Sequence, residues 1–160
     1  MMKLKTRSKA NRFLFLLGFF KIPMILFCRP KIVEITDEKC VIKIPLKRRV
    51  KNHVNSMYIG ALTIGADLTS GFLAMRHIET SGRNIILIFK DMHADYLKLV
   101  QGDAFFTCND GDKVKQAVQI AAETGERQNI PVDITVTVPS DLADEPAAKY
   151  TLTLSIKDKG

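Results

Sequence analysis

The stretch MYIGALTIGADLTSGFLAM, residues 57–75, decides the fold of this chain. It is a continuous apolar run with a single charged residue, Asp67. Because this run is too long for a single strand, it predicts one long buried helix. Asn55 or Ser56 supplies the expected N-cap. A transmembrane helix is the competing interpretation, but a central aspartate costs about 2.5–3.5 kcal/mol on insertion scales and the flanking sequence is strand-like.

The segments on either side of this helix alternate between apolar and polar residues, as antiparallel strands do. Strands are expected at 31–36, 39–46, 84–97, 103–109, 130–139 and 147–157. The remaining features are a turn at 37–38, a short helix at 111–124 with its cap at 109–112 and its stop at 124–125, and a hairpin loop at 141–146. One long apolar helix among antiparallel strands predicts an α+β fold in which the sheet wraps round the helix.

The N-terminal segment, residues 1–30, differs from the single domain expected over 31–160. It is basic over 1–12 and apolar over 13–28. A helix is expected over 9–20 and should break at Pro23, and its apolar run is too short for a bilayer, which takes about 20 residues. Two interpretations are open. The segment packs on the domain, or residues 1–28 form a basic amphipathic anchor on an anionic membrane surface.

The formal charge of +7 belongs to this segment and not to the body of the chain. Residues 1–31 carry eight of the 24 basic residues and none of the 17 acidic ones. Residues 32–160 therefore hold 16 basic and 17 acidic residues, a net charge of −1. A near-neutral body without basic strands interleaved with aromatic residues argues against nucleic-acid binding.

The three cysteines, Cys28, Cys40 and Cys108, are widely spaced and form no pair at a metal-binding interval. We expect reduced, buried thiols in a cytoplasmic protein, with no metal and no bound cofactor. His77 and His93 are interpreted as ordinary surface or strand residues.

A stripe of small and polar residues runs along one face of the long helix at intervals of three and four. Its members are Gly60, Thr63, Asp67, Ser70 and Gly71. Burying an ionised carboxylate costs several kcal/mol in order of magnitude unless it is paired. Asp67 therefore either bonds a backbone group or an arginine, or it lines a cleft as a general base or nucleophile with a raised pKa.

The start of the helix is a second chemical feature. Its first backbone N–H groups have no intrahelical partner and carry the positive end of the helix dipole. At Met57, Tyr58 and Ile59 these groups are candidates to stabilise an oxyanion. Gly60 would allow a ligand to approach the backbone closely.

The sequence RVKNHVNSMYIGAL, residues 49–62, resembles a motif of the hotdog-fold thioesterase-like superfamily, in a branch of uncharacterised proteins. The dipeptide at 22–23 and TGER at 124–127 fit the same branch. The branch is related to acyl-CoA thioesterases of the phenylacetate-pathway type. Those enzymes place His-Gly-Gly at the helix start and an acid nine residues after the histidine. Here Tyr58, Ile59 and Gly60 occupy the turn, and Asp67 is the acid.

The resemblance implies a homodimer or a dimer of dimers, with a curved antiparallel sheet round one central helix in each protomer. The active site would lie between subunits, where the helix start of one polarises a thioester carbonyl and Asp67 of the other activates water or attacks directly. The expected catalytic residues are Asp67, Asn52, Tyr58 and Gly60. The expected substrate-binding residues are His53, Ser56, Met57, Ile59, Thr63 and Ser70.

Alternatives to this function remain open at the level of sequence. The basic loop of Lys47, Arg48, Arg49 and Lys51 is either a solvated turn or a site for the phosphates of coenzyme A, which would enter as part of the substrate. His53 either packs in its loop or serves the site. The protein is either a hydrolase of acyl-CoA or acyl-carrier-protein thioesters, or a non-catalytic hotdog module that binds acyl chains or the inner face of the membrane. A hydratase would need histidine where Phe72 stands, and a Ser-His-Asp esterase would show G-x-S-x-G, which is absent.

Overall fold

The computed structural model describes residue 4 and residues 6–143 and 145–160. Residues 1–3 and 5 of the predicted N-terminal segment, and Asp144 of the predicted loop at 141–146, lie outside the described residues. The elements in chain order are α1 (Arg7–Phe20), α2 (Pro23–Cys28), β1 (Lys31–Ile35), β2 (Cys40–Ile44), the 3-10 turn η1 (Arg48–Val50), α3 (Ile59–Ser81), β3 (Ile85–Tyr96), β4 (Ala104–Cys108), α4 (Gly111–Thr124), β5 (Gln128–Thr137), α5 (Pro139–Leu142) and β6 (Pro146–Asp158).

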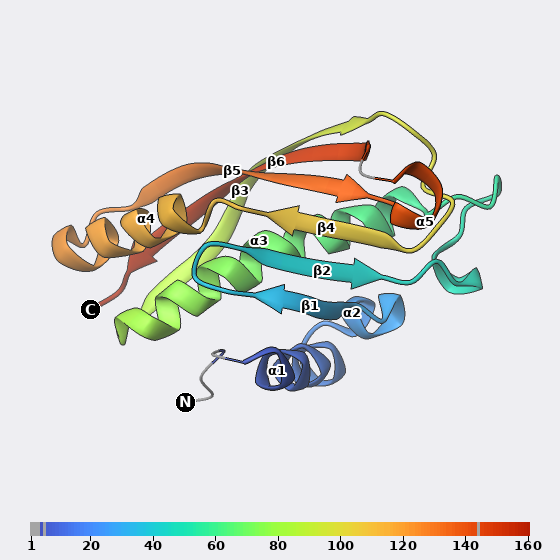
Figure 1. Cartoon of the computed structure of the whole chain (residues 1–160). Coiled ribbons are helices and arrows are strands. Elements are labelled where there is room, and N and C mark those ends of the chain that lie inside the picture. Colours follow the sequence, from blue (N-terminus) through green and yellow to red (C-terminus); the bar gives the residue numbers. More distant parts are fainter. Residues whose placement is uncertain (1–3, 5, 144) are drawn as a thin grey trace.

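The strands form one six-stranded antiparallel sheet in the order β1-β2-β4-β5-β6-β3. Figure 1 shows the sheet curving over α3, with α4 beside it and α1 and α2 below β1. The described strands leave β1 and β3 as the two edges. The predicted α+β architecture, a curved sheet round one long helix, is therefore confirmed.

The long helix fits its sheet through a close contact at Gly65. A Cβ at this position would collide with the ring of Phe106, a fully buried residue of β4. Glycine therefore lets the backbone of α3 lie directly against the sheet. Most of the neighbouring residues of α3 are also buried, which explains why the helix is apolar on nearly every face.

The ends of α3 differ from the prediction. The helix runs on to Ser81 and stops at Gly82, whose φ of 67° favours glycine. Tyr58 is the N-cap residue, and no side chain caps the helix. The prediction of a cap at Asn55 or Ser56 was wrong, because Ser56 Oγ instead bonds the backbone of Val100 in both directions, at 3.0 and 3.2 Å.

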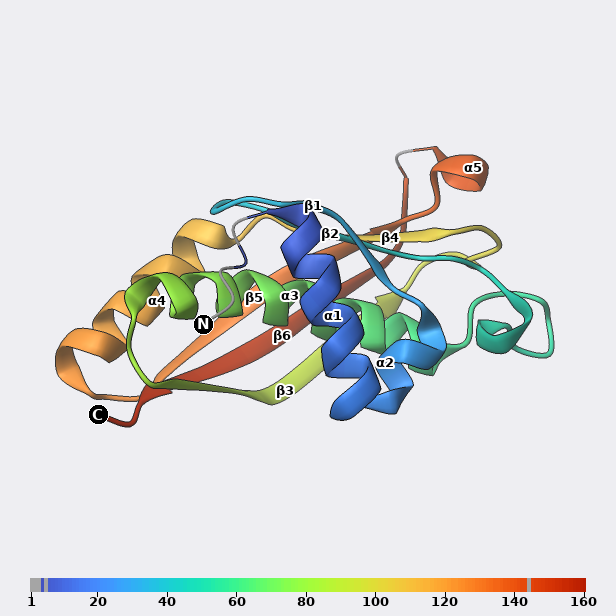
Figure 2. The same ribbon diagram turned by 90° about the horizontal axis from the view of Figure 1, so that it is seen from below.

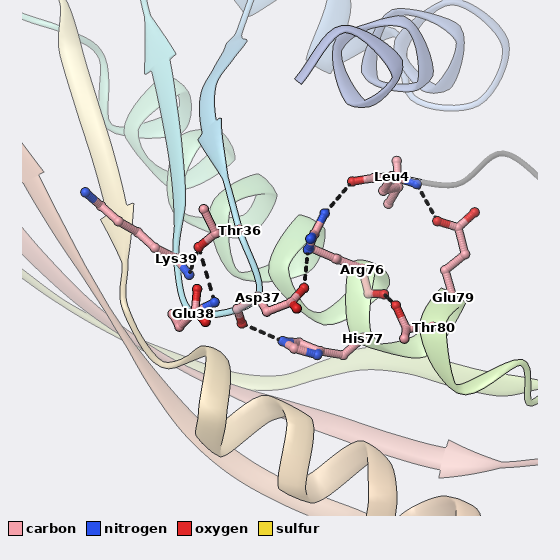
Figure 3. A network of polar contacts seen from close by, with 9 residues as sticks. All are labelled: Leu4, Thr36, Asp37, Glu38, Lys39, Arg76, His77, Glu79 and Thr80. Atoms are coloured by element: carbon pink, nitrogen blue, oxygen red, sulfur yellow. Dashed lines mark hydrogen bonds and ion pairs between the residues drawn. The ribbon is translucent and has the colours of Figure 1, made fainter. Parts of the chain in front are cut away.

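The extension of α3 past residue 75 is held by a polar network at the β1–β2 turn (Figure 3). Arg76 Nε donates to the carboxylate of Asp37 at 2.7 Å, and its Nη1 donates to the carbonyl of Leu4 at 2.8 Å. The ring of His77 lies 2.8 Å from the carbonyl oxygen of Asp37. The hydrogen bond from Arg76 lowers the pKa of Asp37. His77 is therefore a buried helical residue, which corrects its interpretation as a surface or strand residue.

The N-terminal helices pack on the domain. The side chain of Asn11 bonds both the N–H and the C=O of Ile32 at 2.9 Å, which ties α1 to β1. The ring of Phe13 meets that of Phe72 on α3 edge-on, 5.9 Å between centroids. Gly18 allows α1 to approach Leu26 of α2 closely. Across the described residues, no helix combines the length and the apolar character needed to cross a bilayer.

The remaining elements follow the sequence closely. Helix α4 has the predicted bounds and ends at Gly125, where φ is 70°. Asp110 is its N-cap residue, as predicted, but the Asp110 carboxylate accepts a hydrogen bond from the N–H of Asp133 and none from the helix. The turn predicted at 37–38 joins β1 and β2, while the predicted loop at 141–146 begins inside the short helix α5. All three cysteines are free and buried, and His93 lies on β3 with an exposed ring.

The contact at Gly65 yields a stability prediction. Gly65→Ala should lower the free energy of unfolding by about 1–3 kcal/mol, because overpacking against Phe106 outweighs the gain of roughly 1 kcal/mol in helix propensity. Gly71→Ala is the matched control, since its Cβ would meet only the ring of Phe89, at 3.7 Å. Urea unfolding should show the control as stable as wild type or more so. A Gly65→Ala variant as stable as Gly71→Ala would contradict this packing.

Candidate active site

Asp67, the acid predicted to carry the chemistry, lies in the N-terminal half of α3. Thr63 stands one turn before it and Gly71 one turn after it, on the same face of the helix. The side chain of Thr63 lies near that of Tyr150 on β6. A Cβ at Gly71 would stand 3.7 Å from the ring of Phe89 on β3. The carboxyl group of Asp67 is therefore on the helix face that is turned toward the β6–β3 edge of the sheet.

Burial raises the pKa of Asp67 to about 6. No hydrogen bond or ion pair to its carboxylate is formed by the residues that the structure describes, so burial acts without compensation. Every fully buried side-chain N or O atom among these residues has a hydrogen-bond partner, and the unbonded oxygens of Asp67 must therefore reach solvent. The group is an unpaired carboxyl at the boundary between core and water. Within one chain, neither a backbone group nor an arginine satisfies it.

Two tyrosines, Tyr96 and Tyr150, lie in contact with each other beside the helix. Tyr150 Oη donates to Tyr96 Oη at 3.2 Å, and the rings meet edge-on with centroids 5.9 Å apart. Burial raises the pKa of Tyr150 above its ordinary value. Its phenol therefore stays protonated and remains a hydrogen-bond donor at neutral pH. Tyr96 is partly exposed, so the pair extends from the core to the surface.

The edge strand β3 supplies apolar residues that the sequence did not single out. Phe89 and Met92 lie opposite Leu154 and Leu152 of β6, whose side chains are buried on the concave face. Residues directly opposite in an antiparallel pair point to the same face. Both nevertheless stay exposed, at 37% and 46%. In the sequence, only the alternating pattern of β6 indicated this face, because it placed Tyr150, Leu152 and Leu154 on one side of the strand.

At the helix start, the N–H groups of Ile59 and Gly60 have no hydrogen-bond partner among the described residues. The N–H of Met57 donates to Val100 and that of Tyr58 donates to Val50, both at 2.8 Å. The expected oxyanion donors are therefore Ile59 and Gly60, not Met57 and Tyr58. Tyr58 and Ile59 are half exposed. The Tyr58 ring lies over Gly60, where a Cβ would stand 2.7 Å from its Cε1.

The loop before the helix uses its polar groups internally. Asn52 Oδ1 accepts hydrogen bonds from the N–H groups of Val54 and Ser56, each at 3.0 Å. Ser56 is buried against Val100. The Ser56 hydroxyl and Asn52 Oδ1 therefore shape the loop, and only the Nδ2 group of Asn52 is left to orient a substrate within one chain. His53 is exposed at the tip of the same loop.

Ser70 is also engaged within the helix. Its Oγ donates to the carbonyl oxygens of Ala66 and Asp67 at 3.0 and 3.2 Å. Of the predicted site residues, the structure thus leaves the Asp67 carboxyl, the Ile59–Gly60 backbone and the exposed side chains of His53 and Tyr58 available for a ligand, with Thr63 beside Asp67.

Three of the four residues of the basic loop lie together, and Lys51 lies apart from them. Lys47, Arg48 and Arg49 are exposed and line one open cleft of about 410 Å³. The Arg49 guanidinium lies 5.5 Å from the centroid of the Phe27 ring and donates to the carbonyl of Phe27 at 3.4 Å. Lys51 lines a different cleft. The described residues hold no group of His, Cys, Asp and Glu side chains that could bind a metal ion.

An apolar cavity of about 490 Å³ lies farther along α3, between α1 and β3. Met75, two turns beyond Asp67 along α3, is part of its lining. Phe13 of α1 and Leu87 of β3 face it from the other sides. Figure 2 shows α1 crossing beneath α3 on this side of the molecule. The sequence predicted the face of α3 that carries Asp67, but it did not predict this cavity, because the cavity forms only where α1 packs against the domain.

A family model matches residues 11–156, nearly the whole chain, and is described as "Domain of unknown function (DUF4442)". The chain belongs to this family. No curated protein matches it. The match begins inside α1 and ends within β6, so the DUF4442 domain comprises the sheet, α3 and most of the N-terminal helices.

Solved structures establish the fold of this DUF4442 domain. A protein of unknown function from Chlorobaculum tepidum has a TM-score of 0.81 at 13% identity, with 96% of this chain and 97% of that chain covered. A protein from Pseudomonas aeruginosa, described as a probable thioesterase, has a TM-score of 0.76 at 21% identity, with coverage of 92% and 95%. A thioesterase from Haemophilus influenzae has a TM-score of 0.67 at 12% identity, covering 98% and 94%. The fold is the hotdog fold that the sequence resemblance implied.

Proposed function

We propose that this DUF4442 protein hydrolyses an acyl-CoA or acyl-carrier-protein thioester in the cytoplasm, at a site shared by two subunits. The observation that carries the proposal is the unpaired, half-buried carboxyl of Asp67, whose pKa is raised to about 6. A general base works best when its pKa lies near the working pH. A protein that only bound acyl chains would gain nothing from this acid.

The chemistry assigned to Asp67 is proton transfer. The ionised carboxylate takes a proton from water, and the resulting hydroxide adds to the thioester carbonyl carbon. The N–H groups of Ile59 and Gly60 stabilise the oxyanion of the tetrahedral intermediate. The intermediate then breaks its C–S bond, and the leaving thiolate takes the proton back from Asp67. Water is consumed, and a carboxylic acid and a thiol are released.

The spacing of these groups favours a shared site. Gly60 and Asp67 are seven residues apart on one helix, which corresponds to roughly 10 Å along its axis at 1.5 Å per residue. Reacting atoms must approach to about 3–3.5 Å. One thioester therefore cannot meet both groups of a single chain. Two antiparallel helices in a homodimer would set the start of one beside Asp67 of the other.

The exposed strand β3 supports such a dimer. It is an edge of the sheet and carries exposed apolar side chains, which monomeric proteins usually avoid on a long edge. They are Ile88, Phe89, Met92 and Tyr96. Pairing two copies through β3 would cover this edge and bring the Phe89 and Met92 side chains, which share the concave face, next to the proposed site. A dimer of such dimers is the alternative assembly.

The proposed substrate follows from what surrounds Asp67. The acyl chain would extend along α3 from Asp67 past Gly71 to the apolar cavity at Met75. The phosphates of coenzyme A would meet Lys47, Arg48 and Arg49, whose cleft carries no acid. Within the hotdog superfamily, the helix acid nine residues after Tyr58 favours kinship with acyl-CoA thioesterases of the phenylacetate-pathway type.

Replacing the acid tests the proposed chemistry. Asp67→Asn should reduce thiol release from a panel of acyl-CoA substrates at least tenfold, because an amide cannot accept the proton of water. In the wild type, kcat/KM should rise with pH up to about 6 and level off above it, because only the ionised form of Asp67 is active.

The matched control is Asp112→Asn, which changes an exposed aspartate of α4 and should leave turnover intact. Circular dichroism would show that both variants fold. Undiminished turnover in Asp67→Asn would refute the catalytic assignment. Failure of the wild type to release thiol from any substrate of the panel would favour the non-catalytic, acyl-binding module.

Charging the β3 edge tests the shared site. Met92→Asp should convert the protein to monomers in light scattering and lower turnover at least tenfold, because it places a charge in the proposed interface. Val33→Asp is the control, since Val33 is an exposed apolar residue of the opposite edge strand, β1. A wild type that is monomeric and active would exclude a site formed by two subunits.

A further inference from the structure

The α1–α2 hairpin carries an exposed apolar surface that the proposed catalysis does not use. We call it the hairpin surface. It consists of Phe15, Phe19, Phe20, Ile22, Met24 and Phe27, which are 44–70% exposed. The rings of Phe15 and Phe19 stack at 6.1 Å, and those of Phe19 and Phe20 meet edge-on at 4.9 Å. Phe15, Phe19 and Phe20 thus form a contiguous aromatic group and not scattered single exposures.

The hairpin exposes these residues because its other face is fully used. Ala10 and Leu14 of α1 and Ile25 of α2 are buried against the domain. Gly18 lets the two helices approach closely, so no apolar side chain of the hairpin surface can turn inward between them. Figure 1 shows the pair at the lower margin of the molecule, with no other described helix or strand below it.

Cations border this surface. A cleft of about 490 Å³ between α1, α2 and η1 has an apolar floor that includes Leu14, Phe15 and Leu26. Arg29, Lys31 and Arg49 line the same cleft. Residues 6–31 contain no aspartate or glutamate. The cleft therefore combines apolar groups with positive charge and has no acid of its own.

We propose that the hairpin surface docks the protein on a bilayer that contains anionic phospholipid. The aromatic and aliphatic side chains at the turn between α1 and α2 enter the boundary between headgroups and acyl chains. Arg29 and Lys31 bind lipid phosphates beside them. Interfacial anchoring requires this combination of a bulky apolar face with a basic flank, and it needs no membrane-spanning helix.

The charge of the surface selects lipid over protein partners. A second copy of this chain would bring two basic rims together, which costs energy through like-charge repulsion. An anionic bilayer attracts the rim and also accepts the apolar side chains without a shaped groove. The proposal is independent of thioester hydrolysis, since neither Asp67 nor the helix start of α3 takes part.

Vesicle sedimentation of the full-length protein tests the proposal. Wild type should bind vesicles of equimolar phosphatidylcholine and phosphatidylglycerol at least tenfold more tightly than vesicles of phosphatidylcholine alone, and added salt should weaken this binding. The double variant Phe19→Ser/Phe20→Ser should lose at least tenfold in affinity for the anionic vesicles. Arg29→Glu/Lys31→Glu should abolish the preference for anionic lipid.

Two controls match these variants. Ile120→Ser removes an exposed apolar side chain, and Lys115→Glu reverses a charge, both on α4. Each should bind vesicles as wild type does. Equal binding of wild type to neutral and anionic vesicles, or none to either, would overturn the proposal. A different outcome would also overturn it. If the Phe19→Ser/Phe20→Ser variant keeps its vesicle binding but changes its oligomeric state in light scattering, the surface is a protein interface.

Discussion

The close packing of α3 against the concave face of the sheet is the contact on which the rest of the structure depends. Gly65 admits the ring of Phe106, and the helix is buried on nearly every side. A helix in this position must be apolar, and any charge on it is desolvated. The same packing that stabilises the fold therefore raises the pKa of Asp67. The stability of the fold and the proposed chemistry therefore both depend on the burial of α3.

The position of the helix also divides the molecule into two surfaces, for which we propose different roles. Its N-terminal half faces the β6–β3 edge, where the concave side of the sheet stays open. Its C-terminal half is closed by the β1–β2 turn, through Arg76 and His77, and by α1, through Phe13. The open half suits a second subunit and a substrate. The hairpin of α1 and α2, on the closed side, is free to contact a membrane.

Sequence predicted the features that local chemistry determines. Helix α4 was predicted with its correct bounds because its apolar period and Gly125 are local signals, and Asp67 was singled out because a lone acid in an apolar helix is costly. Features that depend on distant contacts were missed. The last turns of α3 have a polar sequence and persist through contacts with Asp37. Phe89, Met92 and Tyr96 could not be distinguished from core residues, because only the sheet order reveals β3 as an open edge.

The proposed chemistry requires that Asp67 be a desolvated, unpaired carboxyl that accepts a proton near neutral pH. Its pKa can be measured directly by carbon-detected NMR titration of the aspartate side chains, with Asp67→Asn to assign the resonance. We expect a midpoint of about 6 for Asp67. A midpoint near 4, the ordinary value for aspartate, would contradict it, because the group would then be solvated or paired and could not act as described.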